Sequence, residues 1–173
     1  LWCKLMRLQN IFFMLTFLFI VLIIAVSFGI AALSGAPWVP ARKRDIAALM
    51  ADMQLRAGKV YVELGCGDGR LVRAAARSGA HSYGYELNPL LWLVAYIRVL
   101  GVPRAHVYLR NFWTQPLDKA DVVMAFLIPR TMPRLEAKLN KEMKPGTTFV
   151  SYVFKLPSKK AAKTHKNWII YEY

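Results

Sequence analysis

The sequence has few cysteines, few histidines and few acidic residues. Cys3 and Cys66 are its two cysteines, which excludes a disulfide framework and makes a reducing compartment the simpler setting. The three histidines are scattered and form no Cys/His spacing typical of a ligand set, so we predict no metal site. Ten acidic residues stand against 24 basic ones, for a net charge of +14. Such a surface suits anionic lipid, nucleic acid or an acidic protein.

Charge is absent from residues 11–33, which are almost entirely apolar. At ~1.5 Å per residue, a helix of this length is on the order of 34 Å long, enough to span a bilayer core of roughly 30 Å. The alternatives are a buried core helix and a signal peptide, because Lys4 and Arg7 precede the run and residues 31–36 offer a cleavage site. The apolar part of a signal peptide is usually shorter, at ~7–15 residues. We therefore predict an uncleaved single-pass anchor.

A proline-rich connector follows the apolar run. Pro37 and Pro40 fix the backbone and oppose helix, so the anchor is expected to end here. Trp38 is expected either at the membrane interface or folded over a ligand cleft. The Arg-Lys-Arg run at 42–44 suits anionic head groups. Apolar residues at helical spacing then predict a lead-in helix over residues 43–54.

The most informative stretch is residues 60–70, where an apolar run ends in Glu63 and three glycines follow at every second position. A strand–turn–helix of this kind cradles a nucleotide at the carboxyl end of a first parallel strand. The dinucleotide fingerprint G-x-G-x-x-G is not met, because Arg70 occupies its third glycine position. A second carboxylate, Glu86, ends the next apolar run about where a strand would present it to two ribose hydroxyls. The alternative is a plain glycine-rich turn with Glu86 as a surface charge.

Strand-like and helix-like segments alternate through the rest of the chain. The expected strands are residues 60–63, 81–86, 106–109, 121–128, 147–154 and 168–171, and the expected further helices are residues 70–78, 88–100 and 132–143. This alternation predicts an α/β fold with a doubly wound, mostly parallel sheet, preceded by one transmembrane helix. Residues 155–166 are expected to be a lysine-rich loop, and a final antiparallel hairpin strand is expected to be missing.

The predicted organisation has three parts: an anchor over residues 1–34, a connector with the lead-in helix over 35–58, and a ligand-binding domain over 59–173. The chain begins with Leu rather than Met, so we expect a fragment at the N-terminus. The missing hairpin strand leaves two explanations open, truncation at the C-terminus or absence of that sheet edge.

The spacing E-x-G-x-G-x-G, together with Glu86, resembles the first motifs of class I methyltransferases that use S-adenosylmethionine (SAM). Further strings resemble one family of small, membrane-anchored lysine methyltransferases, related to those that modify the c subunit of ATP synthase and the ADP/ATP translocase of mitochondria. These strings are residues 35–40, 63–70, 84–89, 111–113, 121–123 with 126–127, and 144–146 with 150–152. The resemblance covers residues 35 to about 154. Glu63 and Cys66 stand where relatives often carry Asp and Ser or Thr.

The resemblance implies SAM as the cofactor and assigns roles to particular residues. The expected cofactor-binding residues are Trp38, Glu63, Gly65, Cys66, Gly67, Asp68, Gly69, Glu86, Leu87 and Asn111. Glu86 would accept from the ribose hydroxyls, Leu87 would pack on the adenine, and Asn111 would pair with the adenine edge. The expected catalytic residues are Asn111, Trp113 and Tyr152, with Trp38 and Phe154 as further candidates to line a lysine channel. No catalytic base is expected, because a desolvated channel beside a sulfonium lowers the pKa of a lysine amine.

The resemblance implies methyl transfer to a lysine of a membrane-embedded protein. The expected partners are that protein and an anionic membrane, without nucleic acid, and the enzyme is expected to be a monomer. We expect a single-pass membrane protein with its domain on the cytoplasmic or matrix-like side, where SAM is supplied. The residues alone leave three alternatives open: methyl transfer to a lipid or small molecule, methyl transfer to RNA, and a non-enzymatic basic module at a membrane surface. The RNA alternative follows from the +12 charge of residues 41–173, which is 22 basic minus 10 acidic residues.

Overall fold

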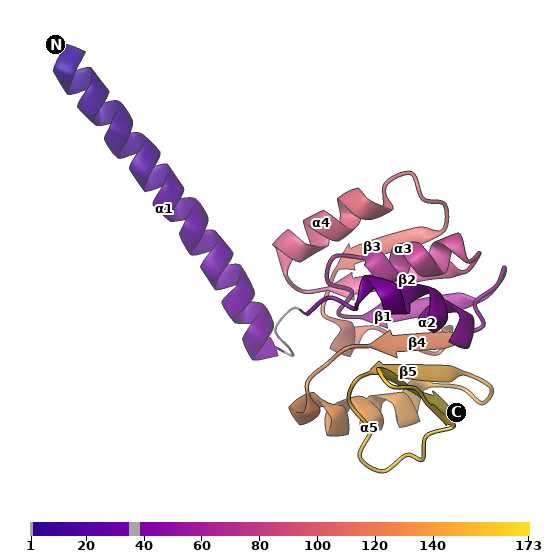
Figure 1. Cartoon of the computed structure of the whole chain (residues 1–173). Coiled ribbons are helices and arrows are strands. Elements are labelled where there is room, and N and C mark those ends of the chain that lie inside the picture. Colours follow the sequence, from indigo (N-terminus) through magenta and orange to yellow (C-terminus); the bar gives the residue numbers. More distant parts are fainter. Residues whose placement is uncertain (1, 35–38) are drawn as a thin grey trace.

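The computed structural model describes residues 2–34 and 39–173, although the side chains at 3–5, 27–28 and 30–34 lie outside that description. A long N-terminal helix stands apart from a layered domain, in which a central sheet carries helices on both faces (Figure 1). The predicted α/β class with a doubly wound, mostly parallel sheet is therefore confirmed.

The described elements follow one another as strands and helices in alternation. The helices are α1 (Trp2–Ser34), η1 (Lys43–Asp45), α2 (Ile46–Asp52), α3 (Arg70–Arg77), α4 (Pro89–Val99), η2 (Phe112–Thr114), η3 (Pro129–Thr131) and α5 (Met132–Glu142), where η marks a 3₁₀ turn. The strands are β1 (Val60–Leu64), β2 (His81–Glu86), β3 (Ala105–Leu109), β4 (Val122–Ala125), β5 (Thr148–Tyr152), β6 (Lys163–Thr164) and β7 (Trp168–Glu172). Most bounds agree with the sequence pattern within a few residues, but β4 ends well before the predicted Ile128.

The seven strands lie in the order β3-β2-β1-β4-β5-β7-β6. The first five are parallel, and β1 pairs with β2 on one side and β4 on the other. The strand order therefore reverses between β1 and β4. In sheets of this kind a ligand binds outside the carboxyl ends of the strands at that reversal, which is where the glycine turn begins.

The expectation of a missing antiparallel hairpin is wrong. β7 pairs antiparallel with β5, and β6 pairs antiparallel with β7, so the hairpin is present at the sheet edge. β6 is formed by Lys163 and Thr164 alone, inside the stretch predicted to be a loop. β6 was missed because two exposed polar residues show no alternation of apolar and polar positions. The antiparallel direction of β7 was missed because the pattern of residues does not reveal strand direction.

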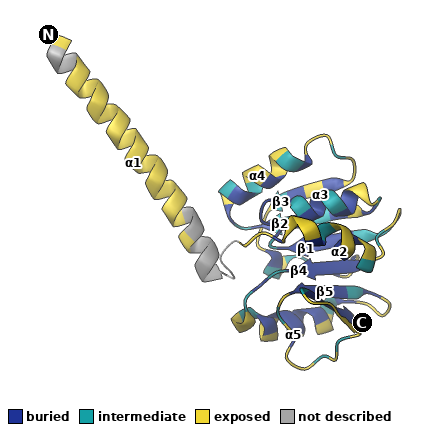
Figure 2. Cartoon of the chain, viewed as in Figure 1, coloured by how far each residue is buried: buried dark blue, intermediate teal, exposed yellow. Residues whose placement is uncertain are grey.

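Two apolar layers form the core, one on each face of the sheet. Tyr61 of β1 packs with the α2, α3 and α4 side, whereas Val62 packs with the α5 side. One face of α4 is exposed in this structure (Figure 2). Along α3, Arg70 and Arg73 are half-buried and Arg77 is exposed.

Helix α1 projects away from the domain, and its described side chains are exposed. Its segment Met6–Val26 is long and apolar enough to cross a membrane. The Gly-Ala-Pro-Trp part of the connector, residues 35–38, falls outside the described residues. The predicted role of Trp38 therefore stays a prediction.

Candidate functional site

The site is built around the turn from β1 to α3. Gly65, Gly67 and Gly69 have φ angles of +78°, +54° and +72°, a backbone region that side chains with a Cβ rarely adopt. The amides of Gly65 and Cys66 both donate to the carbonyl oxygen of Tyr85, at 2.9 and 3.0 Å. The turn is therefore held against the end of β2.

Gly69 is required by packing as well as by its backbone conformation. A Cβ at this position would lie 2.8 Å from the Cβ of Ala95 and 3.0 Å from its Cα. The start of α3 thus lies directly against α4, and the third glycine sets the helix spacing beside the turn.

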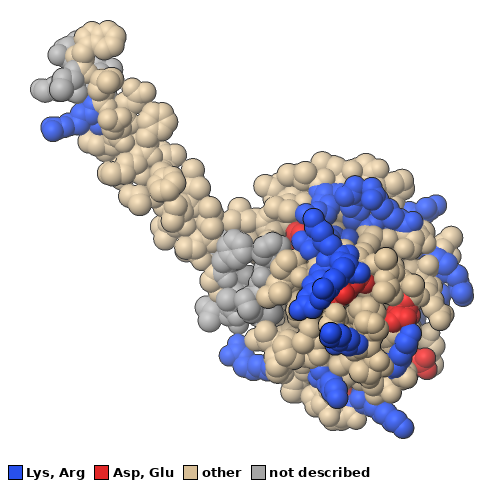
Figure 3. Space-filling model, in the orientation of Figure 1, with Lys and Arg blue, Asp and Glu red and all other residues tan. Residues whose placement is uncertain are grey.

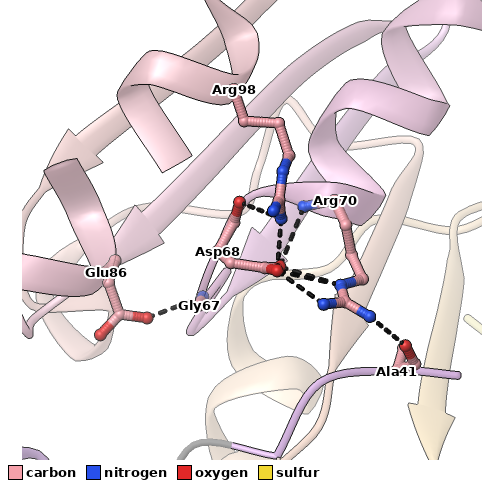
Figure 4. A network of polar contacts seen from close by, with 6 residues as sticks. All are labelled: Ala41, Gly67, Asp68, Arg70, Glu86 and Arg98. Atoms are coloured by element: carbon pink, nitrogen blue, oxygen red, sulfur yellow. Dashed lines mark hydrogen bonds and ion pairs between the residues drawn. The ribbon is translucent and has the colours of Figure 1, made fainter. Parts of the chain in front are cut away.

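Glu86 closes the site from the neighbouring strand. Its Oε2 accepts from the amide of Gly67 at 2.8 Å (Figure 4). Its Oε1 accepts from the amides of Leu87 and Asn88 at 2.9 and 2.8 Å. The Asn88 side-chain oxygen accepts from the amides of Leu90 and Leu91 and so caps α4. The sequence separated Glu86 from the glycine turn by about twenty residues, and the fold joins them by a hydrogen bond.

Glu63 lies buried beside the same turn. Burial, followed by the nearby charges of Asp68 and Glu86, raises its pKa well above the usual range of a carboxyl group, and Tyr61 and the backbone of Val72 offset part of this effect. Its Oε2 is buried and accepts no hydrogen bond from the part of the chain that the structure describes. The charges of Asp68 and Glu86 are therefore near enough to disfavour the ionised form of Glu63. A cation beside Glu63 would favour that form.

Asp68, inside the turn, is neutralised by two arginines. Its carboxylate pairs with Arg70 at 2.7 Å and with Arg98 of α4, and Arg98 also donates to the Asp68 carbonyl oxygen at 2.7 Å (Figure 4). Burial works to raise the pKa of Asp68, but the two arginines outweigh it and hold that pKa below its usual range. Arg70 donates with its remaining nitrogen to the carbonyl oxygen of Ala41 at 2.8 Å. One guanidinium therefore joins the glycine turn to the segment that follows the connector.

Cys66 has a buried side chain in the turn. Burial, and then the charges of Glu63 and Glu86, raises the pKa of its thiol well above the usual range. A thiol of this kind is a poor nucleophile. Its predicted role as a cofactor contact therefore rests on its backbone.

Asn111 and Trp113 lie just after β3, at the carboxyl edge of the sheet. The Asn111 side-chain oxygen accepts from the Trp113 amide at 3.0 Å, which leaves the amino group of this exposed side chain for a ligand. The guanidinium of Arg134 stands 4.2 Å from the centre of the Trp113 ring and occupies one ring face. Lys138, buried on α5, donates to the carbonyl oxygens of Trp113 and Gln115 and fixes this 3₁₀ turn.

Tyr152 is buried at the end of β5, and its hydroxyl has a partner. It donates to Asp45 Oδ2 at 2.6 Å, and Asn167 donates to the same oxygen at 2.7 Å. Burial and then this hydrogen bond raise the pKa of Tyr152. Its ring lies 4.8 Å from that of Phe126. The hydrogen bond from Tyr152 to Asp45 joins the start of the lead-in helix to the sheet. The predicted catalytic role of Tyr152 stays a prediction.

The predicted site residues fall into two groups, one around the glycine turn and one after later strands of the sheet. Those around one turn are Glu63, Gly65, Cys66, Gly67, Asp68, Gly69, Glu86 and Leu87. Asn111, Trp113, Tyr152 and half-buried Phe154 follow later strands of the sheet. The residues missed were Arg98, Asp45 and Lys138. Arg98 could have been recognised from the sequence, because it is the single charged residue in an otherwise apolar helix.

This sheet order, with an acidic glycine turn after β1 and a carboxylate ending β2, is that of the class I methyltransferases. The family description "ANTKMT methyltransferase domain" matches residues 63–163. The lysine N-methyltransferase of the ATP synthase c subunit from Rattus norvegicus is 38% identical over 126 residues, which cover 70% of this chain and 57% of that protein. The chain thus spans little more than half the length of that relative. The protein-lysine N-methyltransferase of Saccharolobus islandicus (strain REY15A) is 32% identical over 125 residues, covering 69% of this chain and 78% of that protein.

Among solved structures, an RNA methyltransferase from Salinibacter ruber in complex with S-adenosyl-L-homocysteine superposes with a TM-score of 0.70 and 25% identity. The match covers 78% of this chain and 92% of that one. A SAM-dependent methyltransferase from Thiobacillus denitrificans shares the fold with a TM-score of 0.57. The chain belongs to the ANTKMT methyltransferase domain family, within the class I SAM-dependent methyltransferases.

Proposed function

We propose that this protein is a membrane-anchored enzyme that transfers a methyl group from SAM to the side-chain amine of a lysine in a membrane protein. The observation that carries the proposal is the joining of the two acidic motifs. Glu86 Oε2 accepts from the Gly67 amide at 2.8 Å, close to buried Glu63, at the point where the strand order reverses. Family membership and the names of the relatives support the reaction type.

The residues present fit SAM on two grounds. Glu63 Oε2 is a buried acceptor with no donor among the described residues, and it would take the α-ammonium of the cofactor, directly or through water. A cation beside Glu63 would also offset the burial and the neighbouring charges that disfavour its ionised form. Glu86 would accept from the ribose hydroxyls with lone pairs beyond its three backbone contacts, and Leu87 and Asn111 would border the adenine.

SAM, when bound, supplies a methyl group on a positively charged sulfur. The task of the chain is to hold a neutral lysine amine in line with that group. A free lysine has a pKa near ~10.4, so roughly one in a few thousand is neutral at pH 7. Trp113, Tyr152 and Phe154 would surround the amine with apolar surface and lower its pKa by desolvation. Arg134 over one face of Trp113 leaves the other face for a methylated ammonium.

The membrane part of the proposal is supported by the segment Met6–Val26 and by the names of relatives that act on the c subunit of ATP synthase and the adenine nucleotide translocase. The C-terminal end of α1 lies beside the edge of the sheet where the strands end (Figure 1). A lysine close to the membrane surface would then be within reach of the site. The domain would face the cytoplasm or a matrix-like compartment, where SAM is made.

The test uses the full chain in proteoliposomes with methyl-labelled SAM and solubilised membrane proteins as substrate. Label recovered on lysine after protein digestion is the expected result. Label extracted into organic solvent, or found in RNA and not in protein, would contradict the proposed substrate. Gly67→Arg is the matched inactive control, because its side chain would stand at a φ of +54° where Glu86 contacts the turn.

An RNA substrate is the second candidate. It is favoured by the Salinibacter ruber neighbour, which the chain covers almost completely, and by the +12 charge of residues 41–173. Lys and Arg side chains outnumber acidic ones over the visible face of the domain (Figure 3). Adding total RNA to the same assay separates the two candidates, because methylated nucleosides are resolved from methyl-lysine by mass spectrometry.

A further inference from the structure

The outward face of α4 is apolar and open to solvent. Its five large apolar residues between 44% and 60% exposed are Leu93, Val94, Tyr96, Ile97 and Leu100. At ~100° per residue they occupy about 160° of the helix circumference, opposite the buried side (Figure 2). Together they expose roughly 400 Å² of apolar surface, the size of the largest apolar patch on a typical monomer, which is often functional.

A hollow of about 410 Å³ continues this face beyond the end of the helix. Tyr96, Leu100 and Pro103 line it together with other residues of the α4–β3 turn. It is shallow and open, so it suits a flexible apolar group such as part of an acyl chain better than a rigid polar ligand.

The charges around the face favour an anionic lipid surface over an apolar protein. Residues 87–117 contain three arginines and no Asp or Glu. Arg98 is bound to Asp68, whereas Arg104 and Arg110 are exposed at the two ends of β3, the strand under α4. In Figure 3 the upper margin of the domain is mainly uncharged, and Lys and Arg side chains lie below it. Apolar and aromatic residues bordered by arginine are typical of helices that lie in a head-group layer.

The position of α4 in the molecule agrees with this partner. The backbone of α1 approaches that of α4, so a helix that crosses the bilayer would hold α4 close to the membrane. We propose that α4 lies in the head-group layer of an anionic bilayer, with Leu93, Ile97 and Leu100 inserted; this rests on the proposed anchor. Asn88 caps α4 and its amide binds Glu86, so the membrane contact fixes the height of the cofactor site above the bilayer.

The test measures the depth of three labels on the full chain in vesicles of phosphatidylcholine with about one third phosphatidylglycerol. Cys3→Ser removes one native thiol, and buried Cys66 gives the background without an added cysteine. An environment-sensitive fluorophore is attached at Ile97→Cys on α4 and at Phe19→Cys in α1. Lys141→Cys, at an exposed position of α5, carries the same fluorophore as the matched control. Quenching is compared between shallow nitroxide lipid, deep nitroxide lipid and aqueous iodide.

The Ile97 label is expected to be quenched by shallow nitroxide at least twofold more than the Lys141 label, and to be shielded from iodide. This difference is expected to shrink when phosphatidylglycerol is omitted. If the Phe19 label is quenched by deep nitroxide while the Ile97 label behaves like the Lys141 label, the α4 proposal is overturned and the anchor stands. If the Phe19 label is not quenched, the anchor fails. Shielding of Ile97 that requires added membrane protein would assign the face to a protein partner and overturn the lipid proposal.

Discussion

Glu63→Gln separates the cofactor role of the site from its stability. The Glu63 carboxylate is buried, repelled by Asp68 and Glu86, and has an oxygen without a donor among the described residues. Burial and the charges of Asp68 and Glu86 disfavour the ionised form of Glu63, so the neutral amide is expected to raise the free energy of unfolding by about 1–2 kcal/mol at pH 7. For a chain of this size that corresponds to a melting temperature higher by roughly 3–6 °C.

The pH dependence of this effect has a definite sign. The folded pKa of Glu63 lies above its unfolded value of about 4.3, so wild-type stability is retained below that pH and lost as pH rises through the folded pKa. The stability gain of Glu63→Gln should therefore vanish near pH 4 and grow toward neutral pH. Thermal unfolding of the detergent-solubilised protein without SAM, recorded across this range, measures it.

The same substitution should weaken SAM binding. Loss of a charged partner for the cofactor's ammonium costs about 1.5–3 kcal/mol, or roughly 10–150-fold in Kd, measured by calorimetry. Glu136→Gln is the matched control, because this buried carboxylate on α5 accepts from the amides of Ser158 and Lys159 and should lower stability without changing Kd. A Glu63→Gln protein that melts no higher than wild type at pH 7 and binds SAM equally well would refute the reasoning.

Three further substitutions test the parts around the turn. Asp68→Asn breaks both arginine contacts and should lower the free energy of unfolding by about 2 kcal/mol at pH 7. Because the folded pKa of Asp68 is lowered, this loss should begin to shrink near pH 4 and disappear as pH falls through that folded pKa; an equal loss at neutral and strongly acid pH would contradict it. Gly69→Ala should cost about 2–4 kcal/mol in chemical denaturation, because its Cβ would lie 2.8 Å from Ala95 at a positive φ, and Ala95→Gly should restore part of it. Tyr152→Phe and Asp45→Asn should reduce kcat equally if the hydroxyl acts through its hydrogen bond to the lead-in helix, whereas a larger effect of Tyr152→Phe alone in steady-state kinetics would establish a direct role.

Local patterns predicted the elements that local chemistry determines. The glycine turn, the Asn88 cap and the buried strands followed from spacing, from side-chain capping and from apolar runs. The two-residue strand β6 was missed, because its place in the sheet depends on hydrogen bonds to β7 and not on its own residues.

The sequence pattern did not predict which side chains far apart in the sequence contact one another. Arg98 reaches Asp68 across 30 positions and Tyr152 reaches Asp45 across 107, and both pairs depend on how helices pack on the sheet. Glu86 contributes to the fold as well as to the site. Its carboxylate holds three backbone amides, so Glu86→Ala would weaken the protein before any cofactor is added.

The Arg70 guanidinium has a consequence for any shortened version of this protein. It bridges the Asp68 carboxylate and the carbonyl oxygen of Ala41, so the chain just past the connector helps to hold the glycine turn. A domain cut after Ala41 would leave that nitrogen without its acceptor and would loosen the turn. A pull on the N-terminal segment would reach the same turn through one side chain.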